Sequence, residues 1–365
     1  MDFASGTNNS SRETISIVGS HFGPLLKYIE QSNITDIDFN GQALWIRDIY
    51  NIRTCMYEPI VTEEWVNALA SRIADAVGSP FNMTNPVLEA ETEDLRITCT
   101  HSSISINGVS MCIRKTSKQP RITYESALRD KYADRNILNL IISCVKAKMN
   151  IIICGEPGVG KTEFAKFLCG YISPSEKVVT IEDTPEWHYK DNNPGSDCIE
   201  LRTSANFSYT TALKTCMRLN PNRIMLSEVR SVEAASLIEC WSTGVKGITT
   251  LHTDDIRKIP DRLLNMMHTM DADRLENNVY SSLDVGILLR SKLYFDRLGQ
   301  QEKRYRYIDQ LGFFDRAGQS NQHIYIVKNG HLVIDSKTSL PVKFPNSKIA
   351  KFNLAAINSP FADPN

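Results

Sequence analysis

Four short apolar runs each end at a residue suited to phosphate chemistry, and this repetition constrains the fold of the 365-residue chain more than any other feature. The runs span residues 151–154, 178–181, 224–226 and 248–251. Runs of this length, with turn or helix signals between them, are typical of the fully buried strands of a parallel sheet. Ligands of such sheets bind beyond the carboxyl ends of the strands. We therefore expect one cleft to collect the residues that follow the four runs.

The first run leads into a loop that fits the phosphate-binding pattern G-x-x-x-x-G-K-[ST]. Apolar residues at helical spacing follow it, so the loop has the strand and helix flanks that the motif requires. Its glycines let backbone N–H groups surround a phosphate, its lysine reaches the β- and γ-phosphates, and its threonine hydroxyl coordinates Mg²⁺. The predicted nucleotide-binding residues here are Gly155, Glu156, Pro157, Gly158, Val159, Gly160, Lys161 and Thr162.

Carboxylates and a histidine follow the other three runs. Glu228 stands where a nucleotide hydrolase needs a carboxylate to hold Mg²⁺ or to orient water. Glu182 is the favoured general base, whereas Asp183 is equally compatible with a functional role as base or metal ligand and with a turn before Pro185. His252 ends the fourth run, where sensing of the terminal phosphate and a structural role are both open.

Arginines could neutralise the charge that develops on phosphate oxygens during phosphoryl transfer. Arg218 and Arg230 lie in the same part of the chain as the cleft residues. Arg96 and Arg114 lie in the amino-terminal part and reach a nucleotide only if that part closes over the cleft. For each of the four, an ordinary ion pair or a solvated surface position is at least as good an interpretation.

Composition limits the partners and the compartment. The chain has 41 basic and 42 acidic residues, so no global field favours nucleic acid or membranes, and we expect no direct sequence-specific nucleic-acid binding. Nine cysteines, with no C-x-x-C pair, indicate buried thiols in a reducing compartment. The start of the chain has no apolar signal segment, and the most apolar stretch, 137–154, is interrupted by charges, which indicates a cytoplasmic protein.

Length and pattern predict two domains. The expected segments are a disordered terminus at 1–13, an α+β domain at 14–118, a linker at 119–134, an α/β domain at 135–336 and a tail at 337–365. The expected helices lie at 25–29, 62–78, 135–148 and 256–280. The expected strands besides the four runs lie at 34–40, 43–46, 95–100, 105–113, 285–290, 305–314 and 323–327.

Four segments, in this order, resemble the signatures of the traffic ATPases of type II and type IV secretion, a superfamily that also powers type IV pili and conjugation. Residues 155–162, 180–186, 220–230 and 248–253 resemble its Walker A loop, aspartate-rich box, Walker B segment and histidine box. Residues 34–41 and Arg96 with 113–115 are similar to amino-terminal motifs of its type IV secretion and tight-adherence branch. The resemblance covers residues 30 to 330, approximately.

The resemblance implies a homohexamer whose subunits hold ATP and Mg²⁺ between a smaller α+β amino-terminal domain and a RecA-like P-loop NTPase domain. The residues it implies are Lys161 and Thr162 for phosphate and Mg²⁺, Glu182 as catalytic glutamate, Glu228 as Walker B carboxylate, His252 as second histidine of its box, and Arg218 and Arg230 as coupling arginines. It also implies a place at the inner face of the membrane, as a peripheral partner of a membrane-embedded secretion or pilus complex.

Three features depart from the family pattern. Ser227 precedes Glu228 where glycine is usual, which puts a side chain where backbones approach closely. Ser231 stands where an acidic residue or glycine is common, and segment 243–247 lacks the first histidine of its box. The leading hypothesis is an ATP-hydrolysing motor, and the alternative is an ATP-binding assembly or regulatory subunit with little hydrolysis. The resemblance, and the missing lid-like arginine cluster, disfavour a P-loop kinase acting on a small molecule.

Overall fold

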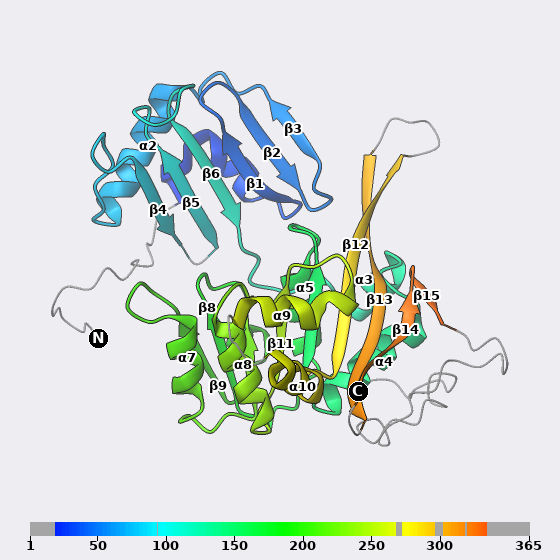
Figure 1. Cartoon of the computed structure of the whole chain (residues 1–365). Helices are drawn as coiled ribbons and strands as arrows, with labels where there is room; N and C mark the ends of the chain where they lie inside the picture. The colour runs from blue at the N-terminus through cyan, green and yellow to red at the C-terminus, as the bar shows by residue number, and fades with distance from the viewer. Residues whose placement is uncertain (1–18, 93, 268–271, 296–301, 318–319, 334–365) are drawn as a thin grey trace. The chain divides into compact units, whose positions relative to one another are not determined.

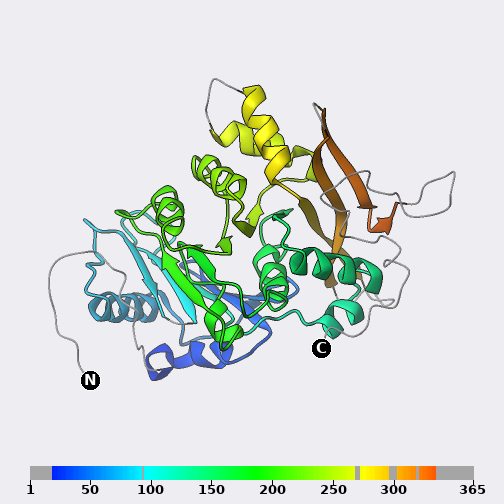
Figure 2. The ribbon, with the colours of Figure 1, turned by 90° about the horizontal axis from the view of Figure 1, so that it is seen from below.

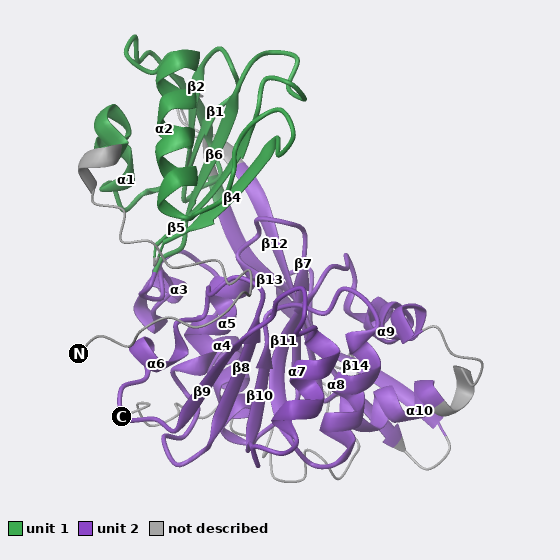
Figure 3. Ribbon diagram, turned by 90° about the vertical axis from the view of Figure 1, so that its left-hand side faces the viewer, with its two compact units in different colours: residues 1–117, 295–304 green, residues 118–294, 305–365 purple. Residues whose placement is uncertain are grey.

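The structure is a computed structural model that describes residues 19–92, 94–267, 272–295, 302–317 and 320–333. It divides into two compact units, shown in Figures 1 and 3: residues 1–117 with 295–304, and residues 118–294 with 305–365. The predicted terminus at 1–13 and the predicted tail at 337–365 lie outside the described residues.

The first unit is a six-stranded sheet with a long helix on one face (Figure 3). Its helices are η1 (Gly19–Leu25), α1 (Leu26–Ile29) and α2 (Glu63–Ala76). Its strands are β1 (Ile34–Phe39), β2 (Leu44–Asp48), β3 (Arg53–Met56), β4 (Val87–Glu91), β5 (Leu95–Thr100) and β6 (Ser110–Lys115). They lie in the order β3-β2-β1-β6-β5-β4, and every neighbouring pair is antiparallel.

Helix α2 begins where the sequence predicts it. The Thr62 hydroxyl caps the helix by accepting the backbone N–H of Trp65 at 3.3 Å. Leu69 and Ile73 form its buried stripe and belong to the same core as Ile97 of β5. The cap and the stripe together fix the start of the helix and the face that it turns to the sheet.

Two parts of the first unit differ from the prediction. Strand β6 starts at Ser110 rather than at residue 105, because a turn in which Ile104 and Ser105 donate to the His101 carbonyl comes first. Gly108, with φ of 96°, completes the turn in a conformation that other residues avoid. The edge strands β3 and β4 are not predicted from sequence. The side chains of β3 are mostly exposed, and β4 carries two glutamates among its five residues, so neither shows a clear apolar run.

The second unit is a nine-stranded sheet with helices on both faces (Figures 1 and 2). Its helices are α3 (Tyr124–Arg129), α4 (Arg135–Lys146), α5 (Lys161–Cys169), α6 (Tyr189–Asn192), α7 (Tyr209–Cys216), α8 (Glu233–Ser242), η2 (Ile256–Lys258), α9 (Ile259–Met267) and α10 (Ala272–Ser282). Its strands are β7 (Ile151–Gly155), β8 (Val178–Glu182), β9 (Cys198–Arg202), β10 (Arg223–Leu226), β11 (Lys246–Leu251), β12 (Val285–Phe295), β13 (Glu302–Ala317), β14 (Ser320–Lys328) and β15 (His331–Leu332). In the part of the chain that the structure describes, none of the helices has the length and apolar character needed to cross a bilayer.

The four apolar runs form the centre of this sheet, as predicted. The sheet order is β15-β14-β13-β12-β7-β11-β10-β8-β9, and the stretch from β9 to β12 is parallel throughout. Ile151 and Ile153 of β7 pack in the core that includes α4 and α5, whereas Ile152 and Cys154 pack in the core that includes α8. Because both faces are covered, these strands are mainly apolar on both faces, and their carboxyl ends share one edge.

The predicted linker at 119–134 holds regular structure. Thr123 and Ser126 form a reciprocal capping box that starts α3. Ala127 and Tyr132 are buried in a core of the second unit, and Tyr132 stacks on Phe164 of α5 with ring centroids 5.6 Å apart. The segment between Lys118 and α4 is therefore part of the second unit rather than a free connection.

Candidate nucleotide site

The loop between β7 and α5 has the backbone conformation of a phosphate cradle. Gly155, Gly158 and Gly160 have φ angles of 148°, 74° and 96°. A Cβ atom at Gly155 would lie 2.6 Å from the Leu289 carbonyl oxygen, so only glycine fits there. Gly160 stands at the cap of α5 and supplies no side-chain cap, which leaves the first N–H groups of the helix available to an anion.

Lys161 is held at the loop by its own backbone and by the histidine of the fourth run. Its Nζ lies 3.1 Å from the Gly155 carbonyl oxygen, 3.3 Å from that of Glu156 and 3.2 Å from Nδ1 of His252. The side chain is buried, and this burial lowers the pKa of Lys161 to about 8, against the opposing effect of the Glu228 charge. The ammonium group is therefore held at the loop by two carbonyl oxygens and an imidazole nitrogen.

A chain of polar contacts continues from His252 across the ends of the strands. Nε2 of His252 lies 2.8 Å from Oε1 of Glu228, and Oε2 of Glu228 lies 2.8 Å from Nε of Arg230. Arg230 also reaches Asp183, with 3.0 Å between Nη1 and Oδ2. Burial and the nearby Lys161 lower the pKa of His252, so its imidazole is neutral near pH 7. In that state Nδ1 accepts from Lys161, and Nε2–H donates to Glu228.

Glu182 lies at the same edge of the sheet but has other contacts. It ends β8 beside β10, where the Ser227 N–H donates to the Ile181 carbonyl at 3.0 Å. Its Oε1 accepts the backbone N–H groups of Glu186 and Trp187, both at 3.0 Å. Burial raises the pKa of Glu182 to about 8, although these two hydrogen bonds oppose the shift. Its carboxylate is thus bound by the turn that follows β8 and is not a member of the chain from Lys161 to Asp183.

Ser227, which departs from the family's glycine, has a partner that the sequence does not reveal. Its hydroxyl lies 2.9 Å from the Tyr209 hydroxyl, which also accepts the Asp183 N–H at 3.0 Å. Tyr209 is the first residue of α7, whose start is fixed by the Ser208 cap. The Ser208 cap is a sequence signal for the helix start, but it does not indicate which strand ends Tyr209 reaches.

The structure does not bring all the predicted arginines to this edge. Arg218 follows α7 and precedes β10, so it lies at the amino end of the strands, exposed and opposite to the phosphate loop. Arg96 and Arg114 belong to the first unit, where they are paired in register on β5 and β6. Nε of Arg114 lies 2.9 Å from Oδ1 of Asp36 on β1.

Oxygen donors for Mg²⁺ are present among the predicted residues. The described residues contain no group of three or more His, Cys, Asp or Glu side chains that could hold a metal ion by themselves. Mg²⁺ in nucleotide sites commonly takes one or two protein oxygens and completes its shell with substrate phosphates and water. The Thr162 hydroxyl and the carboxylates of Glu228 and Asp183 are donors of this kind, so the residues fit the ion.

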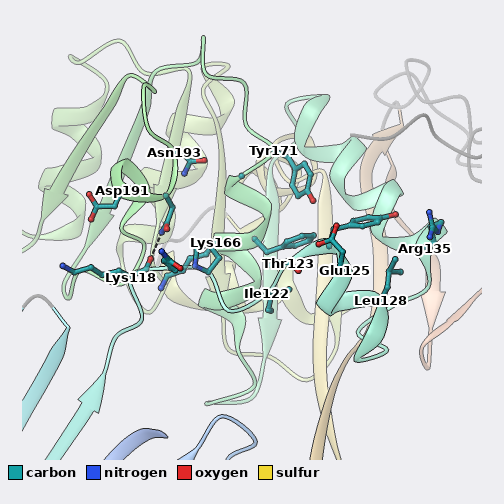
Figure 4. A pocket seen from close by; sticks show the side chains of 16 residues that line it. Lys118, Ile122, Thr123, Glu125, Leu128, Arg135, Lys166, Tyr171, Asp191 and Asn193 are labelled. Carbon is teal, nitrogen blue, oxygen red and sulfur yellow. Dashed lines mark hydrogen bonds between the residues drawn. The ribbon is translucent and has the colours of Figure 1, made fainter. Parts of the chain in front are cut away.

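A separate pocket of about 1170 Å³ lies near the carboxyl end of α5 (Figure 4). Its walls come from segment 118–125, α3, α5 and α6, and Figure 4 labels Tyr171 on one side and Asp191 on the other. Asn192 donates to the Lys118 carbonyl at 2.7 Å, which joins two of these walls. The lining carries both signs of charge and includes none of the predicted site residues.

Comparison with known proteins identifies a matching family and several similar proteins. The model of the family described as type II/IV secretion system protein matches residues 87–310. An uncharacterized protein of Bacillus anthracis is 27% identical over 337 residues, which are 89% of this chain and 75% of that protein. The conjugal transfer protein TrbB of Rhizobium radiobacter is 25% identical over 62% of this chain and 68% of its own length. The type IV secretion system protein VirB11 of Bartonella quintana is 24% identical over 66% of this chain and 78% of its own length.

Solved structures show the same fold. The ATPase DotB of Legionella pneumophila superposes with a TM-score of 0.59 at 16% identity, over 82% of each chain. The pilus retraction motor PilT with bound ADP superposes with a TM-score of 0.55 at 18% identity, over 77% of this chain and 80% of its own. The predicted fold class, a RecA-like α/β domain with a smaller α+β amino-terminal domain, is confirmed.

Proposed function

Because the chain belongs to the type II/IV secretion system protein family, a family of ATPases, we propose that it is an ATP-hydrolysing motor of a type IV secretion, conjugation or pilus machine. One observation carries the proposal: at the carboxyl edge of the central strands, Lys161 contacts His252, and His252 contacts Glu228. These residues lie in the segments that follow β7, β10 and β11, so the contacts join the phosphate loop to the predicted Walker B carboxylate.

The residues of this edge take distinct roles in the proposal. The glycine-rich loop and Lys161 bind the phosphates, and Thr162 and Glu228 hold Mg²⁺, with Asp183 as a further candidate ligand. When bound, Mg²⁺ would neutralise charge on the β- and γ-phosphate oxygens. Neutral His252 can keep its contact with Glu228 while it releases Lys161 to a phosphate.

Glu182 is the proposed general base for the attacking water. Burial raises the pKa of Glu182 to about 8, so in the free protein it is largely protonated at neutral pH. Its basic form therefore requires either a pH near 8 or an approaching cation that lowers the pKa.

Arginines from outside this edge complete the proposed motor. Arg96 and Arg114 lie in the first unit, so they can contact nucleotide only if the two units close on it, a ligand-gated closure. Arg218 lies at the opposite edge of its own sheet, so its proposed role requires a neighbouring subunit. We propose the homohexamer that the family resemblance implies, in which a neighbouring subunit is present.

The relatives indicate the setting. TrbB is named for conjugal transfer and VirB11 for type IV secretion, so we propose a membrane-embedded complex of that kind as the partner. The protein would be cytoplasmic and peripheral to the inner face of the membrane.

Phosphate release tests the proposal. Purified protein with Mg²⁺ and ATP should release phosphate, Lys161→Ala should abolish release, and Lys214→Ala, an exposed lysine on α7, should not change it. Analytical ultracentrifugation with a non-hydrolysable ATP analogue should show a hexamer. Release no greater than that of Lys161→Ala, or a monomer at every concentration, would refute the motor.

The second candidate is an ATP-binding assembly or regulatory subunit with little hydrolysis. The observation that favours it is the Glu182 carboxylate, which is buried and bound by two backbone N–H groups. A fluorescent ATP analogue that binds the protein but not Lys161→Ala, without phosphate release, would select this candidate.

A further inference from the structure

Five residues form a closed ring of contacts at the ends of β8 and β10. One arc consists of charged groups: Asp183 contacts Arg230, and Arg230 contacts Glu228. The other arc consists of hydroxyl groups: the Asp183 N–H donates to Tyr209, and Tyr209 contacts Ser227. The peptide bond between Ser227 and Glu228 closes the ring.

The contacts of the two arcs differ in strength. The Arg230 side chain is 56% exposed, and exposed ion pairs contribute little to stability because water screens them. Tyr209 is half-buried, and burial raises the pKa of Tyr209 to about 12, so it remains a neutral hydrogen-bonding group at every relevant pH. The charged arc also opens whenever Glu228 leaves Arg230 for another cation, whereas the hydroxyl arc carries no charge that a cation would attract.

Ser227 is the fixed end of the hydroxyl arc. Its N–H donates to Ile181 of β8 at 3.0 Å, and its carbonyl accepts the Thr250 hydroxyl of β11 at 2.8 Å. Hydrogen bonds to β8 and β11, the strands on either side of β10, therefore hold Ser227 in place. Asp183 lies beyond the last residue of β8, and its N–H goes to Tyr209 instead of a neighbouring strand.

We propose that Tyr209 is a positioning residue for hydrolysis, which uses the fixed hydroxyl of Ser227 to hold the peptide between Glu182 and Asp183. This peptide sets the backbone of the proposed general base and of the carboxylate that holds Arg230. The inference rests on the proposed function, since it names what aligns that same site. It also accounts for serine in place of glycine before Glu228, because glycine would leave Tyr209 without this contact.

A double-mutant cycle tests the pair. Tyr209→Phe and Ser227→Gly should each lower kcat at least tenfold and leave the affinity for a fluorescent ATP analogue within twofold. The double variant should be no slower than Tyr209→Phe alone, because Tyr209→Phe already removes the contact that Ser227→Gly breaks. Tyr280→Phe, which removes a half-buried tyrosine hydroxyl on α10, should keep the wild-type kcat.

Hydrogen exchange tests the positioning without turnover. The Asp183 amide should exchange faster in Tyr209→Phe than in the wild type, and Tyr280→Phe should leave it unchanged. An unchanged Asp183 amide, or kcat effects that multiply in the double variant, would overturn the inference. If the wild type releases no more phosphate than Lys161→Ala, the proposed function fails, and hydrogen exchange alone then decides whether Tyr209 holds this peptide.

Discussion

The Nζ atom of Lys161 lies 3.2 Å from Nδ1 of His252, so the lysine of the phosphate loop donates to a neutral imidazole rather than to a carboxylate. A direct ion pair with Glu228 would have to be broken before a phosphate could bind. The neutral imidazole accepts a hydrogen bond from the lysine without forming an ion pair. Its Nε2 atom lies 2.8 Å from Oε1 of Glu228. Exchange of this acceptor for a phosphate oxygen therefore costs less than separation of an ion pair.

Nucleotide affinity should fall at alkaline pH. Burial lowers the pKa of Lys161 to about 8 in the free protein, and a bound phosphate raises it by favouring the charged form. Above about pH 8 binding must therefore take up a proton, and the dissociation constant should rise by up to about tenfold per pH unit.

Fluorescence anisotropy of a labelled ATP analogue between pH 7 and 9.5 measures this effect. The second pKa of a phosphate group is about 6, so the ligand's own charge is nearly constant over this range. Calorimetry at pH 9 in buffers of different ionisation enthalpy should show uptake of close to one proton. A dissociation constant that is flat from pH 7.5 to 9.5 would contradict the prediction.

Glu182→Gln should stabilise the fold at high pH and not at low pH. The folded-state pKa of Glu182 is about 8, above its ordinary value of 4.5, so protonation favours the folded state. The stability this gives is complete below about pH 4.5 and is lost as the pH rises through 8, at the order of 1 kcal/mol per unit. Glutamine keeps the acceptor for Glu186 and Trp187 and cannot ionise.

Urea unfolding of wild type and Glu182→Gln at pH 5.5 and pH 8 checks this. Relative to the wild type, the variant should gain about 2–3 kcal/mol of stability between pH 5.5 and pH 8. All other titrating groups are common to both proteins, so they cancel in the difference. An equal gap at the two pH values would show that Glu182 does not titrate as inferred.

The central strands can be predicted from the sequence. Both of their faces are buried, so they are mainly apolar runs instead of alternating apolar and polar residues. Once β7, β8, β10 and β11 are known to be parallel, the shared edge of Lys161, Glu228 and His252 follows from chain direction alone. The direction in which each side chain points cannot be predicted from chain direction. Glu182 occupies its predicted strand end, yet its carboxylate bonds to the next turn, which depends on the path of residues 183–187.

Contacts between segments that lie far apart in the sequence cannot be predicted from the sequence. Asn150 reads as a polar interruption before the first run, but it is fully buried and joins three strands at their amino ends. Its side chain donates to the Ser282 carbonyl at 2.6 Å and accepts the Gly247 N–H at 3.0 Å, while its N–H donates to Asp284 at 2.8 Å. No local pattern encodes such a link, because its partners lie at least 97 positions away.

Glu176→Gln should destabilise the second unit strongly. Glu176 and Arg223 are 3% and 0% exposed, with 2.8 Å between Oε2 and Nε. Removing one charge of a buried pair leaves the other uncompensated, at a cost of about 3–5 kcal/mol. Denaturant unfolding should show this loss, and Asp130→Asn, in an exposed pair with Arg129, should leave stability unchanged. Equal effects of the two variants would mean that Arg223 finds other compensation.

Arg230→Gln should lower the Mg²⁺ requirement for nucleotide binding while it slows hydrolysis. Nε of Arg230 holds Oε2 of Glu228, so the guanidinium competes with Mg²⁺ for a proposed ligand. Exposed ion pairs contribute about 0.2–1 kcal/mol each, so loss of the two Arg230 pairs should lower the half-saturating Mg²⁺ by about two- to thirtyfold. Phosphate release should nevertheless fall by about tenfold or more, because we propose Arg230 as a cation that offsets charge in phosphoryl transfer.

Titration of Mg²⁺ at fixed labelled ATP separates these two effects of Arg230. Arg257→Gln is the matched control: its pair with Asp255 is also 2.8 Å long, with side chains 54% and 16% exposed, against 56% and 13% for Arg230 and Glu228. The control should change neither quantity, since Arg257 contacts no proposed Mg²⁺ ligand among the described residues. A higher Mg²⁺ requirement in Arg230→Gln would mean that Arg230 orients Glu228 for the metal instead of competing with it, and Glu228 would then need its guanidinium partner throughout the cycle.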